Sequence, residues 1–195
     1  MRGTPIEAVK VGLSSLISTL RRDPYALESA YVSVITYDLT AKLCVPLTEI
    51  GSVSIPDIPV PRTSPTNLGE ALKLVLDRYD QEVVLSTPEA KGDWKPILVV
   101  MTDGAPSDTF LFNQMVERIK SYEFAKIICC AAGPKAKVEP LKALTDDVKS
   151  LETLDAATFT QFVTWVSTAI VPAAQESDAA TDDDELPPPP DSISI

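Results

Sequence analysis

Hydrophobic and polar positions along the chain repeat with the periods of helices and strands. Ile6, Val9 and Leu13 recur at helical spacing after Thr4-Pro5, which predicts a helix from near residue 4 to about residue 22. The same spacing predicts further helices around residues 68–79, 112–119, 139–144 and 159–170. Runs rich in β-branched, aromatic or other apolar residues predict strands at residues 31–37, 41–47, 97–102, 125–132 and 148–153.

The order of these elements indicates the fold class. Helices alternate with apolar strands through most of the chain, which is typical of an α/β domain with a mostly parallel sheet and helices on both faces. We expect one such domain over residues 1–172. Residues 173–195 include the stretch AATDDDELPPPPDS and are predicted to form an acidic, proline-rich, disordered tail, with binding as a polyproline ligand as the alternative.

Charge and composition exclude several classes of function. The net charge is −11, and removing the seven acidic residues after Gln175 leaves −4. This balance argues against nucleic-acid binding, which needs a basic patch. No signal peptide or membrane-length apolar run is present, and the three cysteines have no metal-binding spacing, so we expect small buried thiols and a cytoplasmic protein. The absence of histidine excludes Ser-His-Asp catalysis and leaves oxygen as the ligand for any metal.

The apolar run ILVVM leads directly into the polar turn Thr102-Asp103-Gly104. In an α/β sheet, ligands bind at the carboxyl ends of strands, which is where Asp103 lies. Ser107 and Asp108 follow on the same loop, and Thr66 offers a hydroxyl at the start of another predicted helix. Carboxylate and hydroxyl oxygens suit a hard divalent cation.

Two other interpretations of these residues remain open. Ser107 or Asp108 can cap the helix that follows, as Thr66 or Asn67 can cap theirs, which describes a metal-free scaffold. Asp103 can also act as the nucleophile of a Mg²⁺-dependent phosphohydrolase. Nucleotide binding is disfavoured because no glycine-rich phosphate-binding motif is present.

The motif T-D-G-x-P-S-D after an apolar strand, with P-T-N-L-G-E-A-L upstream, resembles the von Willebrand factor A (vWA) domain. The opening MRGTPIEAVK, the stretch DPYALESAYVSVITYD and the segment VPLTEI resemble the bacterial tellurium-resistance type, often called TerY. The resemblance extends from Met1 to about Val171. It implies a Rossmann-like sheet whose edge carries a metal-ion-dependent adhesion site (MIDAS).

The resemblance also implies roles for individual residues. Thr66 and Asp103 would be metal ligands, Gly104 would permit the turn, and Ser107 and Asp108 would support the loop. The metal would be Mg²⁺, completed by a carboxylate from a protein partner. The function implied is protein binding without enzymatic activity, in a cytoplasmic tellurite and stress-resistance system that includes a kinase and a phosphatase.

The sequence departs from the family at its start. The family's first metal loop reads D-x-S-x-S and directly precedes the Met-x-Gly-x-Pro segment, which begins here at residue 1. We expect an N-terminally truncated sequence, from a misplaced start or a true truncation. The expected consequences are weak or absent Mg²⁺ binding and a sheet without its central strand, between residues 31–37 and 97–102.

Overall fold

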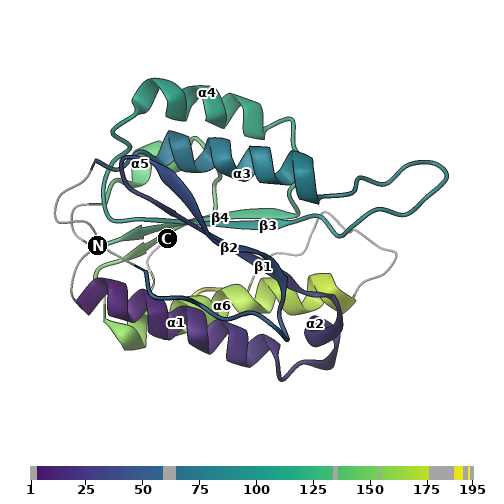
Figure 1. Cartoon of the computed structure of the whole chain (residues 1–195). Helices are drawn as coiled ribbons and strands as arrows, with labels where there is room; N and C mark the ends of the chain where they lie inside the picture. Colours follow the sequence, from purple (N-terminus) through teal and green to yellow (C-terminus); the bar gives the residue numbers. More distant parts are fainter. Residues whose placement is uncertain are drawn as a thin grey trace.

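The computed structural model describes residues 4–58, 65–133, 136–153, 155–175, 187–190 and 193 (Figure 1). The helices are α1 (Thr4–Leu20), α2 (Pro24–Ser29), α3 (Leu68–Glu82), α4 (Thr109–Ile119), α5 (Val138–Leu141) and α6 (Ala156–Gln175). The strands are β1 (Tyr31–Tyr37), β2 (Ala41–Glu49), β3 (Ile97–Thr102), β4 (Lys126–Ala132) and β5 (Val148–Leu151).

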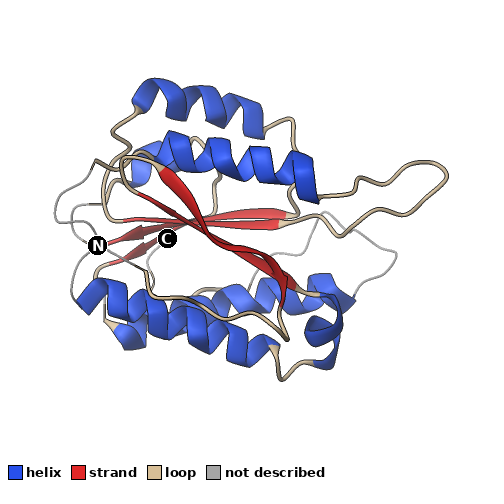
Figure 2. Ribbon diagram, in the orientation of Figure 1, coloured by secondary structure: helices blue, strands red, loops and turns tan. Residues whose placement is uncertain are grey.

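These elements form three layers, with the strands in the middle (Figure 2). Helices α3, α4 and α5 lie on one side of the strands, and α1, α2 and α6 lie on the other. Strand β4 faces both helical layers and therefore has almost no polar residues. Cys129 and Ala131 pack toward α3 and α4, whereas the alternating residues Ile128, Cys130 and Ala132 pack toward α6. The sheet thus separates two hydrophobic cores, as expected for an α/β fold with helices on both faces.

The described strands form two separate sheets. β1 and β2 pair as an antiparallel hairpin, and β3, β4 and β5 form a parallel sheet in that order. Within the described part of the chain, neither β1 nor β2 pairs with β3. The interruption falls between residues 31–37 and 97–102, where the sequence predicts a gap in the sheet. Strand β3 is therefore an edge strand of the described parallel sheet, and Val99 in its middle is 39% exposed.

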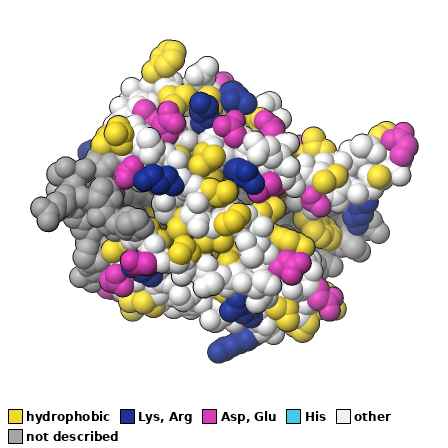
Figure 3. Space-filling model, in the orientation of Figure 1, with side chains coloured by type: hydrophobic (Ala, Val, Ile, Leu, Met, Phe, Trp, Pro, Cys, Tyr) yellow, Lys and Arg dark blue, Asp and Glu magenta, His cyan; other side chains and the backbone are white. Residues whose placement is uncertain are grey.

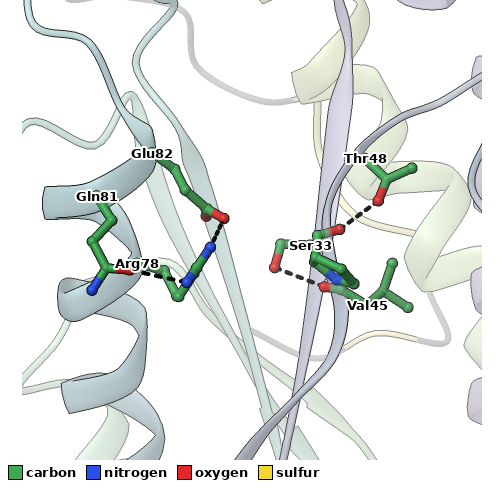
Figure 4. Close-up of polar contacts among 7 residues, drawn as sticks. Ser33, Val45, Thr48, Arg78, Gln81 and Glu82 are labelled. Carbon is green, nitrogen blue, oxygen red and sulfur yellow. Dashed lines mark hydrogen bonds and ion pairs between the residues drawn. The ribbon is translucent and has the colours of Figure 1, made fainter.

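Figure 4 shows polar contacts on helix α3 and within the β1–β2 hairpin. On α3, Arg78 donates to Gln81 and Glu82. On the hairpin, the Ser33 hydroxyl donates to the Val45 carbonyl at 3.0 Å, beside the register shifts that bracket Val34. No contact drawn in Figure 4 joins α3 to the hairpin. Figure 3, in the orientation of Figure 1, shows hydrophobic side chains over the middle of the visible face, where the hairpin crosses between the two helical layers.

Two segments differ from the sequence-based expectation. The first helix, predicted to run to about residue 22, ends at Leu20. Asp23 then caps the short helix α2, which was not predicted, and its carboxylate accepts from the Ala26 amide at 2.9 Å. Helix α6 continues to Gln175, three residues into the predicted tail. Residues 187–190 and 193 also pack against the domain, which differs from the solvated tail expected for them, while residues 176–186 lie outside the described residues.

None of the helices in the described part of the chain is both long and apolar enough to cross a membrane.

Candidate functional site

The candidate site is built on the loop that follows β3. Thr102, the last residue of the strand, is buried, and its hydroxyl donates to the Gly104 carbonyl at 3.1 Å. The Gly104 amide in turn donates to the Thr102 hydroxyl oxygen at 3.3 Å. These two bonds close a tight turn around Asp103, which is half-buried at the carboxyl end of the parallel sheet. A buried threonine therefore fixes the position of the predicted metal ligand.

The Thr66 loop lies directly against this turn. The Thr66 amide donates to the Ser107 hydroxyl oxygen at 3.0 Å, and the Ser107 amide donates to the Thr66 carbonyl at 2.8 Å. A Cβ atom placed on Gly104 would lie 3.2 Å from the Thr66 Oγ1 atom. The structure thus brings together Thr66, Gly104 and Ser107, from segments about forty residues apart in sequence, and places Asp103 beside them.

Asp108 supports the site in a way that the sequence does not indicate. Its two carboxylate oxygens accept from the Gly69 amide at 3.1 Å and the Glu70 amide at 2.9 Å, at the amino terminus of α3. The interpretation of Asp108 as a side-chain cap for the helix that follows it is wrong. It occupies the N-cap position of α4, but its side chain caps α3 instead. A carboxylate there satisfies amides that the helix leaves unpaired and opposes the positive end of the helix dipole.

A third loop, between β1 and β2, joins the same edge. The Asn67 amide donates to the Asp38 carbonyl at 3.0 Å, and the Asn67 side-chain amide donates to the Leu39 carbonyl at 2.9 Å. Asn67 precedes α3 without making a side-chain cap, so the alternative that it caps this helix is wrong. Its side chain instead ties the hairpin turn to the Thr66 loop.

Tyr37 is a residue of the site that sequence reasoning missed. It ends β1, and its hydroxyl donates to the Met101 carbonyl near the end of β3 at 2.8 Å. Burial raises the pKa of the Tyr37 phenol well above its usual range, and the nearby carboxylates of Asp103 and Asp108 raise it further. The phenol therefore stays protonated, and its hydrogen bond links the carboxyl end of β1 to that of β3.

The donor chemistry of this edge suits a hard cation, but few ligands are present. Thr66 contributes a hydroxyl and Asp103 a carboxylate, whereas both oxygens of Asp108 are engaged by α3. Within the described residues, no group of three or more aspartate, glutamate or cysteine side chains is arranged to hold a metal. An ion held by Thr66 and Asp103 would need water or a partner to complete its shell. The assignment of these two residues as ligands stays a prediction.

A family model gives independent information on the fold. The von Willebrand factor type A domain model matches residues 1–166. The chain belongs to this family. The match agrees with the parallel sheet and the two helical layers (Figure 2). The vWA family assignment and the predicted fold class are confirmed.

Solved structures support the same fold. The vWA chain is similar to proximal thread matrix protein 1 from the mussel byssus, with a TM-score of 0.61, 16% identity, and coverage of 85% of this chain and 42% of that one. A second crystal form gives a TM-score of 0.62 with 16% identity over 85% of this chain and 43% of that one. The chain thus spans less than half the length of the mussel protein.

A third structure of the mussel protein is described as having a zinc-occupied MIDAS motif. It has a TM-score of 0.59 and 14% identity, covering 85% of this chain and 43% of that one. At this identity, the likeness shows the fold of our chain and not its ligand. None of the curated proteins compared with the vWA chain matches its sequence.

Proposed function

We propose that this vWA domain is a protein-binding module whose docking edge consists of the Thr66 and Asp103 loops. The observation that carries the proposal is the pair of hydrogen bonds between Thr66 and Ser107, at 3.0 and 2.8 Å. They hold the two predicted ligand loops together without using the Thr66 hydroxyl. The hydrogen bonds of Thr102 within the Asp103 turn and of Asp108 to α3 also hold the loops in place, so the edge is already ordered before a partner binds. Organisation of this kind reduces the ordering cost of binding.

We further propose that a divalent cation, Mg²⁺ in the cell, takes part at this edge. Thr66 and Asp103 would hold it, and their hydroxyl and carboxylate oxygens are ligands that Mg²⁺ accepts. Bound there, the ion would offer an open position to a carboxylate of the partner. The D-x-S-x-S motif of the family's first loop does not occur in the 195 residues, so we expect weak affinity. The zinc-occupied site of the mussel protein supports divalent-cation chemistry at this place in the fold.

The cellular role is the more specific part of the proposal. The opening MRGTPIEAVK and the stretch DPYALESAYVSVITYD resemble the tellurium-resistance type of vWA protein. On that basis, we propose a role in a cytoplasmic tellurite and stress-resistance system, with a kinase or phosphatase of the same system as the partner. The net charge of −11 supports a protein partner over a nucleic acid, because nucleic-acid binding needs a basic patch.

Binding to a candidate kinase or phosphatase partner tests the proposal. The chain is assayed by surface plasmon resonance in Mg²⁺ and again in EDTA. We expect binding in Mg²⁺ to fall at least tenfold in EDTA, and Asp103→Ala to bind as weakly as the EDTA sample. Glu89→Ala, which removes one carboxylate from an exposed loop, is the matched control and should bind normally. Equal binding in Mg²⁺ and EDTA would leave the domain as a metal-free scaffold.

A phosphatase screen separates binding from the phosphohydrolase alternative. We propose that the domain is not an enzyme, so p-nitrophenyl phosphate with Mg²⁺ should give no turnover above the buffer. Turnover that disappears in Asp103→Ala and persists in Glu89→Ala would contradict the proposal and assign Asp103 as a nucleophile.

A further inference from the structure

The four consecutive prolines near the carboxyl end lie against α6. The Trp165 indole Nε1–H donates to the Pro187 carbonyl at 2.7 Å, and the Trp165 side chain is only 5% exposed. The Lys149 Nζ atom lies 5.3 Å from the centroid of the Trp165 ring and steadies it by a cation–π contact. The proline segment therefore makes a specific polar contact with an indole that is otherwise buried.

The chemistry of this contact is that of proline recognition. A run of prolines favours the extended polyproline II helix, which has no internal hydrogen bonds and presents its carbonyl oxygens outward. Domains that recognise such segments use aromatic-lined grooves and gain affinity because the ligand is already stiff. Trp165 supplies both the aromatic surface and an N–H donor aimed at a proline carbonyl.

A second anchor lies three residues beyond the prolines. Ile193 is 4% exposed and belongs to the hydrophobic cluster formed by α1, α6 and the parallel strands. Its amide donates to the Pro190 carbonyl at 2.8 Å, which turns the chain into that cluster. The bound segment is therefore held at two points, by a polar contact at Pro187 and by a buried aliphatic side chain at Ile193.

The chain's own prolines leave space beside α6. A hollow of about 320 Å³ remains between them and the helix. It is lined by Thr160, Gln161, Thr164, Trp165, Thr168, Pro188 and Pro190. The hollow is open to solvent and its lining is mostly apolar, so covering it with another apolar group is favourable. A longer or bulkier proline-rich segment can therefore make contacts here that the tail does not make.

We propose that the face of α6 around Trp165 is a docking site for a proline-rich protein segment. The chain's own residues 187–190 and 193 occupy it and compete with that partner. The partner's segment is a run of prolines followed by an aliphatic residue, as in this chain's own PPPPDSI. Eleven residues, 176–186, connect Gln175 to Pro187 and span up to about 36 Å when extended. This exceeds the distance of about 15 Å along α6 from Gln175 back to Trp165.

A labelled peptide with the sequence LPPPPDSISI tests the proposal by fluorescence polarisation on the full chain. Pro188 is exposed, so Pro188→Ser should weaken the contact of the proline segment with α6 without disturbing the hydrophobic core. We expect Pro188→Ser to bind the peptide at least tenfold more tightly than the wild type, because a tethered tail competes at millimolar effective concentration. Adding Trp165→Phe, which removes the N–H donor, should reverse this gain. Adding Trp94→Phe, at the other tryptophan, should leave it intact.

Three results would overturn the proposal. The first is equal peptide binding by the wild type and Pro188→Ser, and the second is equal binding of a control peptide with alanine in place of every proline. The third is a wild-type dimer that Pro188→Ser abolishes, which would put the tail of a second copy on α6. The indole N–H resonances report independently of peptide affinity, since Pro188→Ser should shift the resonance of Trp165 and not that of Trp94.

Discussion

At the scale of single residues, the geometry of the candidate site depends on Asp108. Its carboxylate leaves the loop after β3 and accepts from two amides at the start of α3, which joins the Asp103 loop to the helix that carries the Thr66 loop. Thr66 and Ser107 add a second connection between the same two loops. The positions of Thr66 and Asp103 are therefore coupled through residues that bind no ligand themselves.

Asp108→Ala should destabilise the domain by about 2 kcal/mol, because two helix amides lose their acceptor and each cap typically contributes about 1 kcal/mol. Urea unfolding followed by circular dichroism measures this change. Asp108→Asn keeps one carbonyl acceptor and should lose roughly half as much free energy. An Asp108→Ala chain as stable as the wild type would show that the cap does not hold the loops together.

Gly104→Ala should weaken divalent-cation binding with little loss of stability. The new Cβ would lie 3.2 Å from the Thr66 Oγ1 atom, so the hydroxyl must move, whereas Gly104 has no positive φ for alanine to strain. The control is Gly51→Ala, whose Cβ would meet only Leu27, at 3.5 Å. Isothermal titration with Mg²⁺ and with Zn²⁺ measures the difference, and equal affinities for the two variants would contradict the predicted role of Thr66.

The sequence predicts some residues of the site and not others. Thr66 and Asp103 follow from a motif, because each stands at a fixed place beside a strand or helix. The capping of α3 by Asp108 joins residues 38 and 39 positions apart in sequence, and the Tyr37 bond to Met101 spans 64 positions. Such contacts depend on how the elements pack, which local pattern does not specify.

At the scale of elements, the burial of β4 on both faces changes the acidity of its two cysteine thiols. Cys129 and Cys130 are fully buried on opposite faces of the strand. Burial raises the pKa of the Cys129 thiol to about 12, and burial also raises that of Cys130. The expectation of small buried thiols holds for these two residues, whereas Cys44 on β2 is only partly buried.

The buried thiols make stability fall at alkaline pH. An unfolded thiol loses its proton near pH 8.5, while the folded Cys129 thiol keeps it up to a pKa of about 12. The stabilising contribution of Cys129 is therefore full below pH 8.5 and is lost between pH 8.5 and 12, at about 1.4 kcal/mol per pH unit, and the raised pKa of Cys130 acts in the same direction. Urea midpoints at pH 8 and pH 10 measure this loss. Cys129→Ala should show a shallower decline, and a decline as steep as that of the wild type would contradict the assignment.

Helix α2 shows where pattern fails at the element scale. It has only six residues, so its hydrophobic positions complete no clear helical period. Asp-Pro typically ends a helix, yet proline also suits the first turn of a new one, with aspartate as its cap. The sequence alone does not distinguish these two outcomes.

At the scale of the whole molecule, the main feature is a sheet in two parts. Local periodicity predicts strands and helices well, because each buries one or two faces. The resemblance to the vWA family predicts the break between residues 31–37 and 97–102, because it supplies the strand order. The packing of Pro187 and Ile193 is not predictable from composition, since it depends on a donor on α6.

The divided sheet should be visible in hydrogen exchange. Strand β4 has neighbours on both sides, whereas β3 pairs only with β4 among the described strands. Amides of β3 that point away from β4 should therefore exchange much faster than any amide in the middle of β4. Residue-resolved exchange measures this difference. Uniform protection along β3 would show that its second edge is paired in solution.

The most direct test of the account is a Mg²⁺ titration followed by amide resonances. If Thr66 and Asp103 hold the ion, the amides of residues 66–67, 103–105 and 107 should shift together and saturate, in the wild type and in the Glu89→Ala control. In Asp103→Ala, the same amides should not move. Shifts elsewhere in the chain, or shifts that persist in Asp103→Ala, would contradict a metal-assisted docking edge at the end of β3.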